Sequence, residues 1–308
     1  MRGWWRDLTD LVLPADCAGC GAPRTALCPR CRATLQGSPA RRVRPVPEPA
    51  GLPVVHAVAP YAAQVRELLL AHKERGALTL TGALGAALAG AVRAGLGAED
   101  GAGAGAGGGA HTGMDRGARV GAGSAGWRRS GPVLLVPVPS ARWAVRARGH
   151  DPVRRMALAA AGELRRTGTP ARVAAVLRQR RPVADQAGLD ARRRLENLAG
   201  ALEVSPGGGR LLGAGRVVLV DDLMTTGASL AEAARALREA AVSPRSGRTA
   251  VYAAATREGR EERWIGAPPG RRESVHSAPE NAMPNASWRV LHAAVIAAPR
   301  DSFEMNRN

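Results

Sequence analysis

Continuous aliphatic runs mark two places along the chain where the polar alternation of a half-exposed strand is missing. Residues 133 to 136 read Val-Leu-Leu-Val, and residues 217 to 220 read Val-Val-Leu-Val. Because a strand with one exposed face alternates apolar and polar residues, these runs predict strands of a parallel sheet that helices cover on both faces. Apolar segments at 54 to 60, 172 to 177 and 249 to 256 predict three further strands.

Apolar residues at helical spacing separate these strands. One predicted helix carries Val65, Leu68, Leu69 and His72 on one face, and the next carries Leu80, Leu84, Ala87, Leu88 and Ala91. Residues 152 to 166 and the segment from Ala228 onward predict two more helices. The alternation predicts an α/β fold with a mostly parallel sheet flanked by helices. Lys73, at the end of the first helix, is as consistent with a charge meeting the helix dipole as with a ligand contact.

Two segments lack this pattern, and they set the expected domain organisation. Residues 97 to 131 are dominated by Gly and Ala and predict a flexible insert without catalytic residues. Prolines interrupt every regular pattern in residues 258 to 308, which are expected to form a disordered tail; only 290 to 298 could form a short strand or helix there. The expected domain therefore spans 52 to 257, behind a small cysteine-rich unit at 8 to 40.

The net charge indicates an anionic ligand. The 308 residues carry a formal net charge of +18, and half of it lies in residues 133 to 196, which hold fourteen arginines and five acidic residues. This favours a pyrophosphate-bearing metabolite or nucleic acid, although a solvated surface suits most of these arginines individually. Because the sequence contains neither a run of roughly 20 apolar residues nor a signal-peptide pattern, we expect a cytoplasmic protein without a membrane span. The oligomeric state stays open.

All four cysteines lie close together, in two Cys-x2-Cys pairs: Cys17, Cys20, Cys28 and Cys31. Four thiolates at this spacing can enclose one tetrahedral Zn²⁺, which would replace a hydrophobic core in so short a unit. The alternative is two disulfides, which reduced surroundings disfavour. With four sulfur ligands, no coordination position remains for chemistry, so we expect a structural zinc ribbon.

The second aliphatic run leads into two acidic residues and a hydroxyl-rich turn. Asp221 and Asp222 could accept hydrogen bonds from two neighbouring ribose hydroxyls. The turn that follows would present backbone N–H groups and hydroxyls to a phosphate at the start of a helix; its residues are Thr225, Thr226, Gly227, Ala228 and Ser229. An acid pair after a strand can also be a helix cap or a solvated turn.

The first aliphatic run is followed by a proline-flanked turn and a basic helix that suit a pyrophosphate. The candidate residues are Pro137, Val138, Pro139, Ser140 and Arg148, while Arg142 and Arg146 fit a solvated face equally well. A polar segment further on suits a mobile basic hood over the site, with Arg180, Gln186, Arg194 and Asn197 as its candidate residues. An ordinary exposed loop with a helix is the alternative.

Residues 217 to 229 resemble the signature by which type I phosphoribosyltransferases bind 5-phosphoribosyl-1-pyrophosphate (PRPP). The order of motifs across residues 8 to 257 is similar to that of the ComF family, a competence-associated bacterial group. Matching features include the four cysteines, Lys73-x-x-Gly76, Arg148-Gly149, and the pattern of Gln186, Leu189, Arg194 and Asn197. His150, Asp151 and Pro152 depart from the family, which usually has an aromatic residue and an amide after the Arg-Gly pair.

The resemblance implies a type I phosphoribosyltransferase fold that binds PRPP, or a related phosphorylated metabolite, together with Mg²⁺. Phosphoribosyl transfer to an unidentified nitrogen acceptor is one expectation, with a role in DNA uptake. The alternative is a non-catalytic PRPP or nucleotide sensor that acts through single-stranded DNA or DNA-processing proteins. A third is a metal-stabilised scaffold with a vestigial pocket.

Overall fold

The computed structural model describes residues 16–105, 131–183, 190–242 and 290–304. Helices in these ranges are α2 (Pro29–Gln36), α3 (Ala63–Lys73), a 3₁₀ turn (Leu78–Leu80), α4 (Thr81–Gly105), α6 (Arg142–Arg148), α7 (Pro152–Arg166), α8 (Ala191–Leu198), α9 (Gly208–Leu212), α10 (Ala228–Val242) and α11 (Asp301–Glu304). Strands are β1 (Arg41–Val43), β2 (Val55–Pro60), β3 (Val133–Pro137), β4 (Ala171–Val173), β5 (Leu177–Gln179), β6 (Leu202–Val204), β7 (Arg216–Leu223) and β8 (Val290–Ala298).

Six strands form one sheet in the order β1-β2-β8-β7-β3-β4, and only β1 is antiparallel to its neighbour. The two aliphatic runs of the sequence are the neighbouring strands β3 and β7, with Leu135 opposite Val218. Helices cover both faces of the sheet, as the unbroken runs predict: α4 and α7 pack on one face and α10 on the other. The fold is therefore α/β with a mostly parallel sheet, as expected.

The C-terminal segment contradicts the predicted tail. Residues 290 to 298 form β8, which lies between β2 and β7 in the middle of the sheet. Side chains 292 to 298 are all buried, including Val295 and Ile296 at 0% exposure. The disordered tail was therefore wrong for residues 290 to 304, whereas one of the two elements allowed at 290 to 298, a short strand, is confirmed. Pairing with two neighbouring strands selects the strand, which the Ala-rich sequence leaves ambiguous. The predicted strand at 249 to 256 lies outside the described residues.

The Gly/Ala-rich insert also begins later than predicted. Helix α4 continues to Gly105, well past the expected boundary at residue 97. Leu96 is buried, and Glu99 lies 3.5 Å from Arg216 at the start of β7, so contacts with the rest of the domain hold this part of the helix. Residues 106 to 130 of the insert lie outside the described part of the chain.

Helix α4 is the one described helix long and apolar enough, over Leu78–Glu99, to cross a membrane by length and composition. Its Leu84, Leu88 and Val92 are fully buried in the core that it shares with α7 and the sheet. A core helix of a folded domain has this character.

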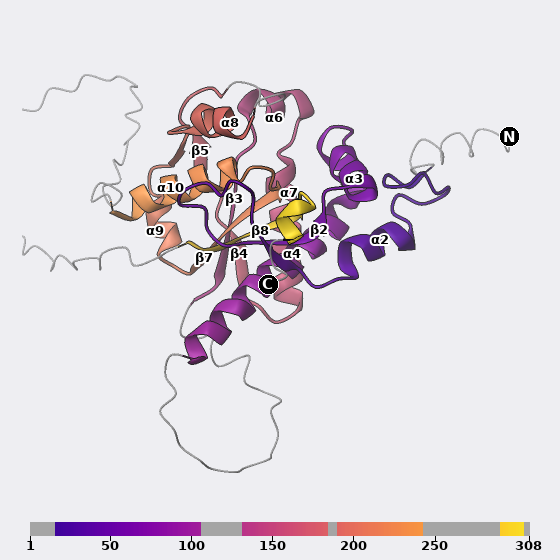
Figure 1. Cartoon of the computed structure of the whole chain (residues 1–308), viewed down its shortest axis with the longest axis horizontal. Coiled ribbons are helices and arrows are strands. Elements are labelled where there is room, and N and C mark those ends of the chain that lie inside the picture. The colour runs from indigo at the N-terminus through magenta and orange to yellow at the C-terminus, as the bar shows by residue number, and fades with distance from the viewer. Residues whose placement is uncertain (1–15, 106–130, 184–189, 243–289, 305–308) are drawn as a thin grey trace, which may run out of the picture.

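The predicted strand near 172 to 177 is divided. Residues 171 to 173 form β4 at the edge of the large sheet, whereas β5 begins at Leu177 and pairs with β6 in a separate two-stranded sheet. Helix α8 lies between β5 and β6 along the chain, and it lies with α6 at one end of the molecule in Figure 1. The C-terminal end of α4 lies at the opposite end of the molecule (Figure 1).

Candidate functional site

The acid pair lies near the carboxyl end of the central strand, β7. β7 includes Asp221 and Asp222 and ends at Leu223, so both acids are inside the strand instead of following it as predicted. Both residues are buried, at 8% and 6% exposure, and the Asp222 backbone N–H donates to Asp221 Oδ1 at 2.9 Å. Burial, together with the neighbouring charge of Asp222, raises the pKa of Asp221 well above its usual range. Two buried carboxylates in contact require a counter-charge.

The counter-charge is Lys73, the only lysine of the chain. Its Nζ donates to Asp222 Oδ2 at 3.1 Å, across 149 positions of sequence. Asp222 raises the pKa of Lys73 although burial opposes the shift, so the amine is held protonated. Lys73 is also the last residue of α3, as the helix-dipole interpretation requires, while its contact with a ligand stays a prediction.

The hydroxyl-rich turn connects β7 to α10 as the sequence predicts. Gly227 has φ +75°, a conformation that favours glycine, and Ala228 is the first residue of α10. Thr226 Oγ1 accepts from the Ala228 N–H at 3.4 Å, while Thr225 is exposed and Ser229 is half-buried. A side chain at position 227 would contact Leu52, which covers that side of the bend.

The predicted pyrophosphate segment lies beside this turn, because β3 and β7 are neighbours. Pro137 ends β3, and the Val138 N–H donates to the Val220 carbonyl at 3.0 Å. Pro139 and Ser140 follow in the same loop, where Ser140 Oγ donates to Asp151 Oδ1 at 3.4 Å. Arg148, at the end of α6, has a largely buried side chain whose Nε lies 3.3 Å from Glu74 Oε2.

Arg142 does not extend toward the acid pair. Its guanidinium donates to the Gln179 carbonyl at 3.2 Å, which attaches α6 to the small sheet. Arg146 is exposed. The solvated face that the sequence allowed for these two arginines therefore fits the structure better than a phosphate contact.

The predicted hood reaches the phosphate turn through one arginine. Arg194 Nη1 donates to Thr225 Oγ1 at 3.4 Å, and Arg194 Nε is buried without a hydrogen-bond partner among the described residues. Arg180 is exposed, Asn197 lies half-buried near the end of α8, and Gln186 lies outside the described residues. Of these candidates, Arg194 is joined to the turn directly.

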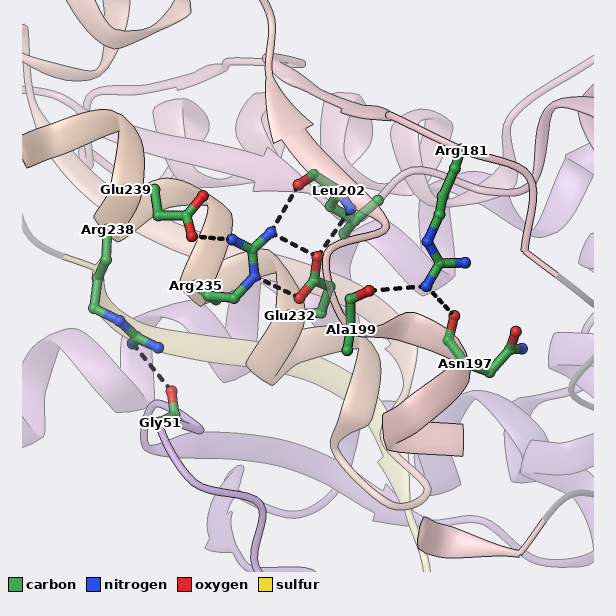
Figure 2. Close-up of polar contacts among 9 residues, drawn as sticks. All are labelled: Gly51, Arg181, Asn197, Ala199, Leu202, Glu232, Arg235, Arg238 and Glu239. Atoms are coloured by element: carbon green, nitrogen blue, oxygen red, sulfur yellow. Dashed lines mark hydrogen bonds and ion pairs between the residues drawn. The ribbon is translucent and has the colours of Figure 1, made fainter. Parts of the chain in front are cut away.

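Two side chains outside the predicted set hold the hood segment in place (Figure 2). Arg181 donates to the carbonyls of Asn197 and Ala199 at 2.9 and 2.8 Å, and so satisfies the C-terminal end of α8. Glu232 of α10 accepts from the Leu202 N–H at 2.9 Å. Neither role was predictable from local spacing, because each contact joins distant parts of the chain.

The four cysteines form a separate cluster beside α3. Their Sγ atoms all lie within 4.8 Å of one another. Tetrahedral coordination by four thiolates places sulfurs about 3.8 Å apart, so the cluster fits one zinc ion. Burial opposes ionisation of Cys17, yet the N–H of Cys28 and further amides lower the pKa of Cys17 to about 6. All four thiols are free, so the disulfide alternative does not describe this structure.

Sequence reasoning missed Glu74. Adjacent to Lys73, it connects the predicted arginine Arg148 to the helix that carries the lysine. Together these contacts gather the ends of β3 and β7, the turn before α10, Arg148 and Arg194 at one edge of the sheet.

A scan against protein-family models and a search of curated proteins gave no match to this chain.

Proposed function

We propose that this chain is a ComF-like phosphoribosyltransferase of type I fold that binds PRPP with Mg²⁺ at the carboxyl edge of the sheet. One observation carries the proposal: a buried, lysine-neutralised acid pair on the central strand stands directly before a hydroxyl-rich turn that opens a helix. Ligands of open α/β sheets bind at the carboxyl ends of the strands. The motif order described above assigns the same ligand to this edge.

In this proposal each group of the site has one task. Asp221 and Asp222 accept hydrogen bonds from the ribose hydroxyls, and the turn at 225 to 229 binds the 5-phosphate through amides and hydroxyls. Arg148 binds the pyrophosphate, and Arg194 screens charge near the phosphate turn. Carboxylate oxygens such as those of Asp222 suit Mg²⁺, which would neutralise the departing pyrophosphate. The protein then acts by positioning and by charge stabilisation, without a nucleophilic side chain.

Calorimetry of PRPP with Mg²⁺ tests the proposal on three proteins: wild type, Asp222→Asn and the control Asp301→Asn. Asp301 is exposed, and it accepts a local hydrogen bond from the Ser302 N–H at the start of α11. We expect wild type and Asp301→Asn to bind alike and Asp222→Asn to bind at least about tenfold more weakly, since a buried charged hydrogen-bond partner is lost. Absence of PRPP binding by wild type refutes the proposal. Release of pyrophosphate with a panel of nitrogen bases then separates an enzyme from a sensor.

A second candidate function is a PRPP or nucleotide sensor that contacts single-stranded DNA or DNA-processing proteins. Exposed arginines of α8 favour it, because the side chains of Arg192 and Arg193 are 89% and 71% exposed. If they contact phosphates, single-strand affinity should fall steeply with added salt, and replacing both by Gln should reduce the salt slope by about 1.4. Affinity that is independent of salt argues against this candidate.

We also assign the cysteine cluster to one structural Zn²⁺, on the donor set and the sulfur spacing. The metal would stabilise the segment from Cys17 to Cys31 and its packing on α3, where Leu68 lies close to Gly19.

A further inference from the structure

The last turn of α3 places opposite charges on neighbouring residues, and each contacts a charged side chain of the site. Lys73 Nζ lies 3.1 Å from Asp222 Oδ2, and Glu74 Oε2 lies 3.3 Å from Arg148 Nε. Lys73 is the last residue of the helix, and Glu74 is its C-cap. A single turn therefore supplies a counter-charge both to the acid pair and to the arginine of the pyrophosphate segment.

Arg148 is satisfied only in part by this contact. Its side chain is 15% exposed, and the contact with Glu74 is made through Nε. Nη1 is buried and has no hydrogen-bond partner among the described residues. A guanidinium binds carboxylate or phosphate best through two parallel hydrogen bonds of about 2.7–2.9 Å. A ligand oxyanion that engages both nitrogens would therefore be held better than Glu74 is.

Glu74 is also placed so that it can leave. Its side chain is 50% exposed, so water solvates the carboxylate once the contact breaks. An ion pair with one half-exposed partner contributes little to stability, and exchanging it for a ligand costs correspondingly little.

We infer that Glu74 is an internal competitor for the ligand's pyrophosphate: it neutralises Arg148 in the free protein and is displaced when a pyrophosphate binds there. Lys73 has the matching position on the acid pair, where it occupies Asp222 in place of an incoming cation. The free site is thus neutralised from within, and it favours a ligand that brings both charges, such as magnesium pyrophosphate, over an anion alone. This inference rests on the proposed function, because it assigns Arg148 to a pyrophosphate.

The test is calorimetry of inorganic pyrophosphate with Mg²⁺ on the full chain, comparing wild type, Glu74→Gln and Glu67→Gln. Glu67 is a matched control: it lies on the same helix, is 39% exposed, and pairs with Arg66 and Arg75, which are not part of the site. Both substitutions remove one negative charge, so long-range attraction changes equally. We expect Glu74→Gln to bind about three- to fivefold more tightly than Glu67→Gln, because only Glu74 competes for Arg148.

The outcomes separate this inference from the proposed function. Suppose that Glu74→Gln binds pyrophosphate no more tightly than Glu67→Gln does, and that Arg148→Gln binds it more weakly than the wild type does. This result overturns the role of Glu74 as a competitor but retains the pyrophosphate site at Arg148. Binding by Glu74→Gln alone, with none detectable in wild type, supports the competitor. Absence of pyrophosphate binding in all variants overturns both. Urea unfolding serves as the control for folding, and we expect Glu74→Gln to have the same unfolding midpoint as the wild type.

Discussion

Glu232 is the buried acid that fastens the hood segment to α10, and replacing it tests this part of the structure without reference to any ligand. Its side chain is 5% exposed and accepts hydrogen bonds (Figure 2) from the Leu202 N–H at 2.9 Å and from Arg235 Nε and Nη2 at 2.7 and 2.8 Å. Arg235 Nη2 also donates to the Leu202 carbonyl at 2.9 Å. The backbone N–H and the carbonyl of Leu202 are thus both hydrogen-bonded to the Glu232–Arg235 ion pair.

Glu232→Gln keeps the shape of the side chain but removes its charge and places an NH₂ group against the donors of Arg235. A hydrogen bond to a charged group contributes about 1.5–3 kcal/mol, and each of these bonds loses its ionised acceptor. Arg235 is 32% exposed and keeps Glu239 and the Leu202 carbonyl as partners, so solvent recovers part of the loss. We expect the free energy of unfolding to fall by about 2 kcal/mol.

Glu239→Gln is the matched control, since Glu239 pairs with the same arginine but is 68% exposed. Its cost should stay within about 0.5 kcal/mol. Urea unfolding at pH 7 measures both variants, and hydrogen exchange of the Leu202 amide locates the effect, because that N–H loses its charged acceptor only in Glu232→Gln. Equal costs for the two variants, or unchanged exchange at Leu202, would refute the reasoning.

The pH dependence gives a second check on the same residue. Burial opposes ionisation of Glu232, but the hydrogen bonds from Arg235 and Leu202 prevail and lower its pKa below the usual 4.5. A carboxyl whose pKa is depressed in the folded state stabilises the protein above the unfolded pKa, and this stabilisation is lost as the pH falls through the folded value. The difference between wild type and Glu232→Gln should therefore narrow below about pH 4.5.

Three further predictions concern the rest of the site. Metal analysis of the purified chain should find about one zinc per chain, lost in Cys28→Ser; metal-free wild type contradicts the assignment. Lys73, as the only lysine, should react faster with an amine-directed reagent in Asp222→Asn, because Asp222 is the main cause of its raised pKa; an unchanged rate by peptide mass spectrometry speaks against the ion pair. Burial, with the nearby charge of His150, lowers the pKa of His72 to about 4. The neutral His72 therefore stabilises the folded protein fully above the pKa of the unfolded chain, near 6.5, and this stabilisation is lost as the pH falls toward 4. In urea unfolding, the free energy of unfolding of the wild type should fall by about 2 kcal/mol between pH 7 and pH 5, and that of His72→Gln should lack this fall. The same pH dependence in both proteins refutes the prediction.

Local pattern predicted those parts of the fold in which a segment's own sequence limits its conformation. The aliphatic runs of β3 and β7 have no helical period, and Gly227 marks a turn that requires positive φ. The start of helix α7 is marked in the sequence by Asp151, which caps the first turn, and by Pro152 at the first helical position. In these cases propensity and tertiary packing favour the same conformation.

Contacts over long sequence distance were not predictable in this way. The run at 290 to 298 contains four alanines, one Leu and one His, so its composition suits a helix as well as a strand, and only its neighbours β2 and β7 select the strand. The pairing of Lys73 with Asp222 depends in turn on where α3 ends relative to β7. No spacing rule connects residues 149 positions apart.

The position of β8 explains why the acid pair is held so firmly. β7 has β3 on one side and β8 on the other, with Val220 opposite Pro137 and Asp221 opposite Val295. The Met224 N–H also donates to the Ala297 carbonyl at 3.0 Å, which extends the pairing past the acids to the start of the turn. Without β8, Asp221 and Asp222 would lie on an edge strand, open to water, and burial would not raise the pKa of Asp221. The burial of the acid pair, and its need for Lys73, therefore originate in β8, a strand that carries no chemistry of its own.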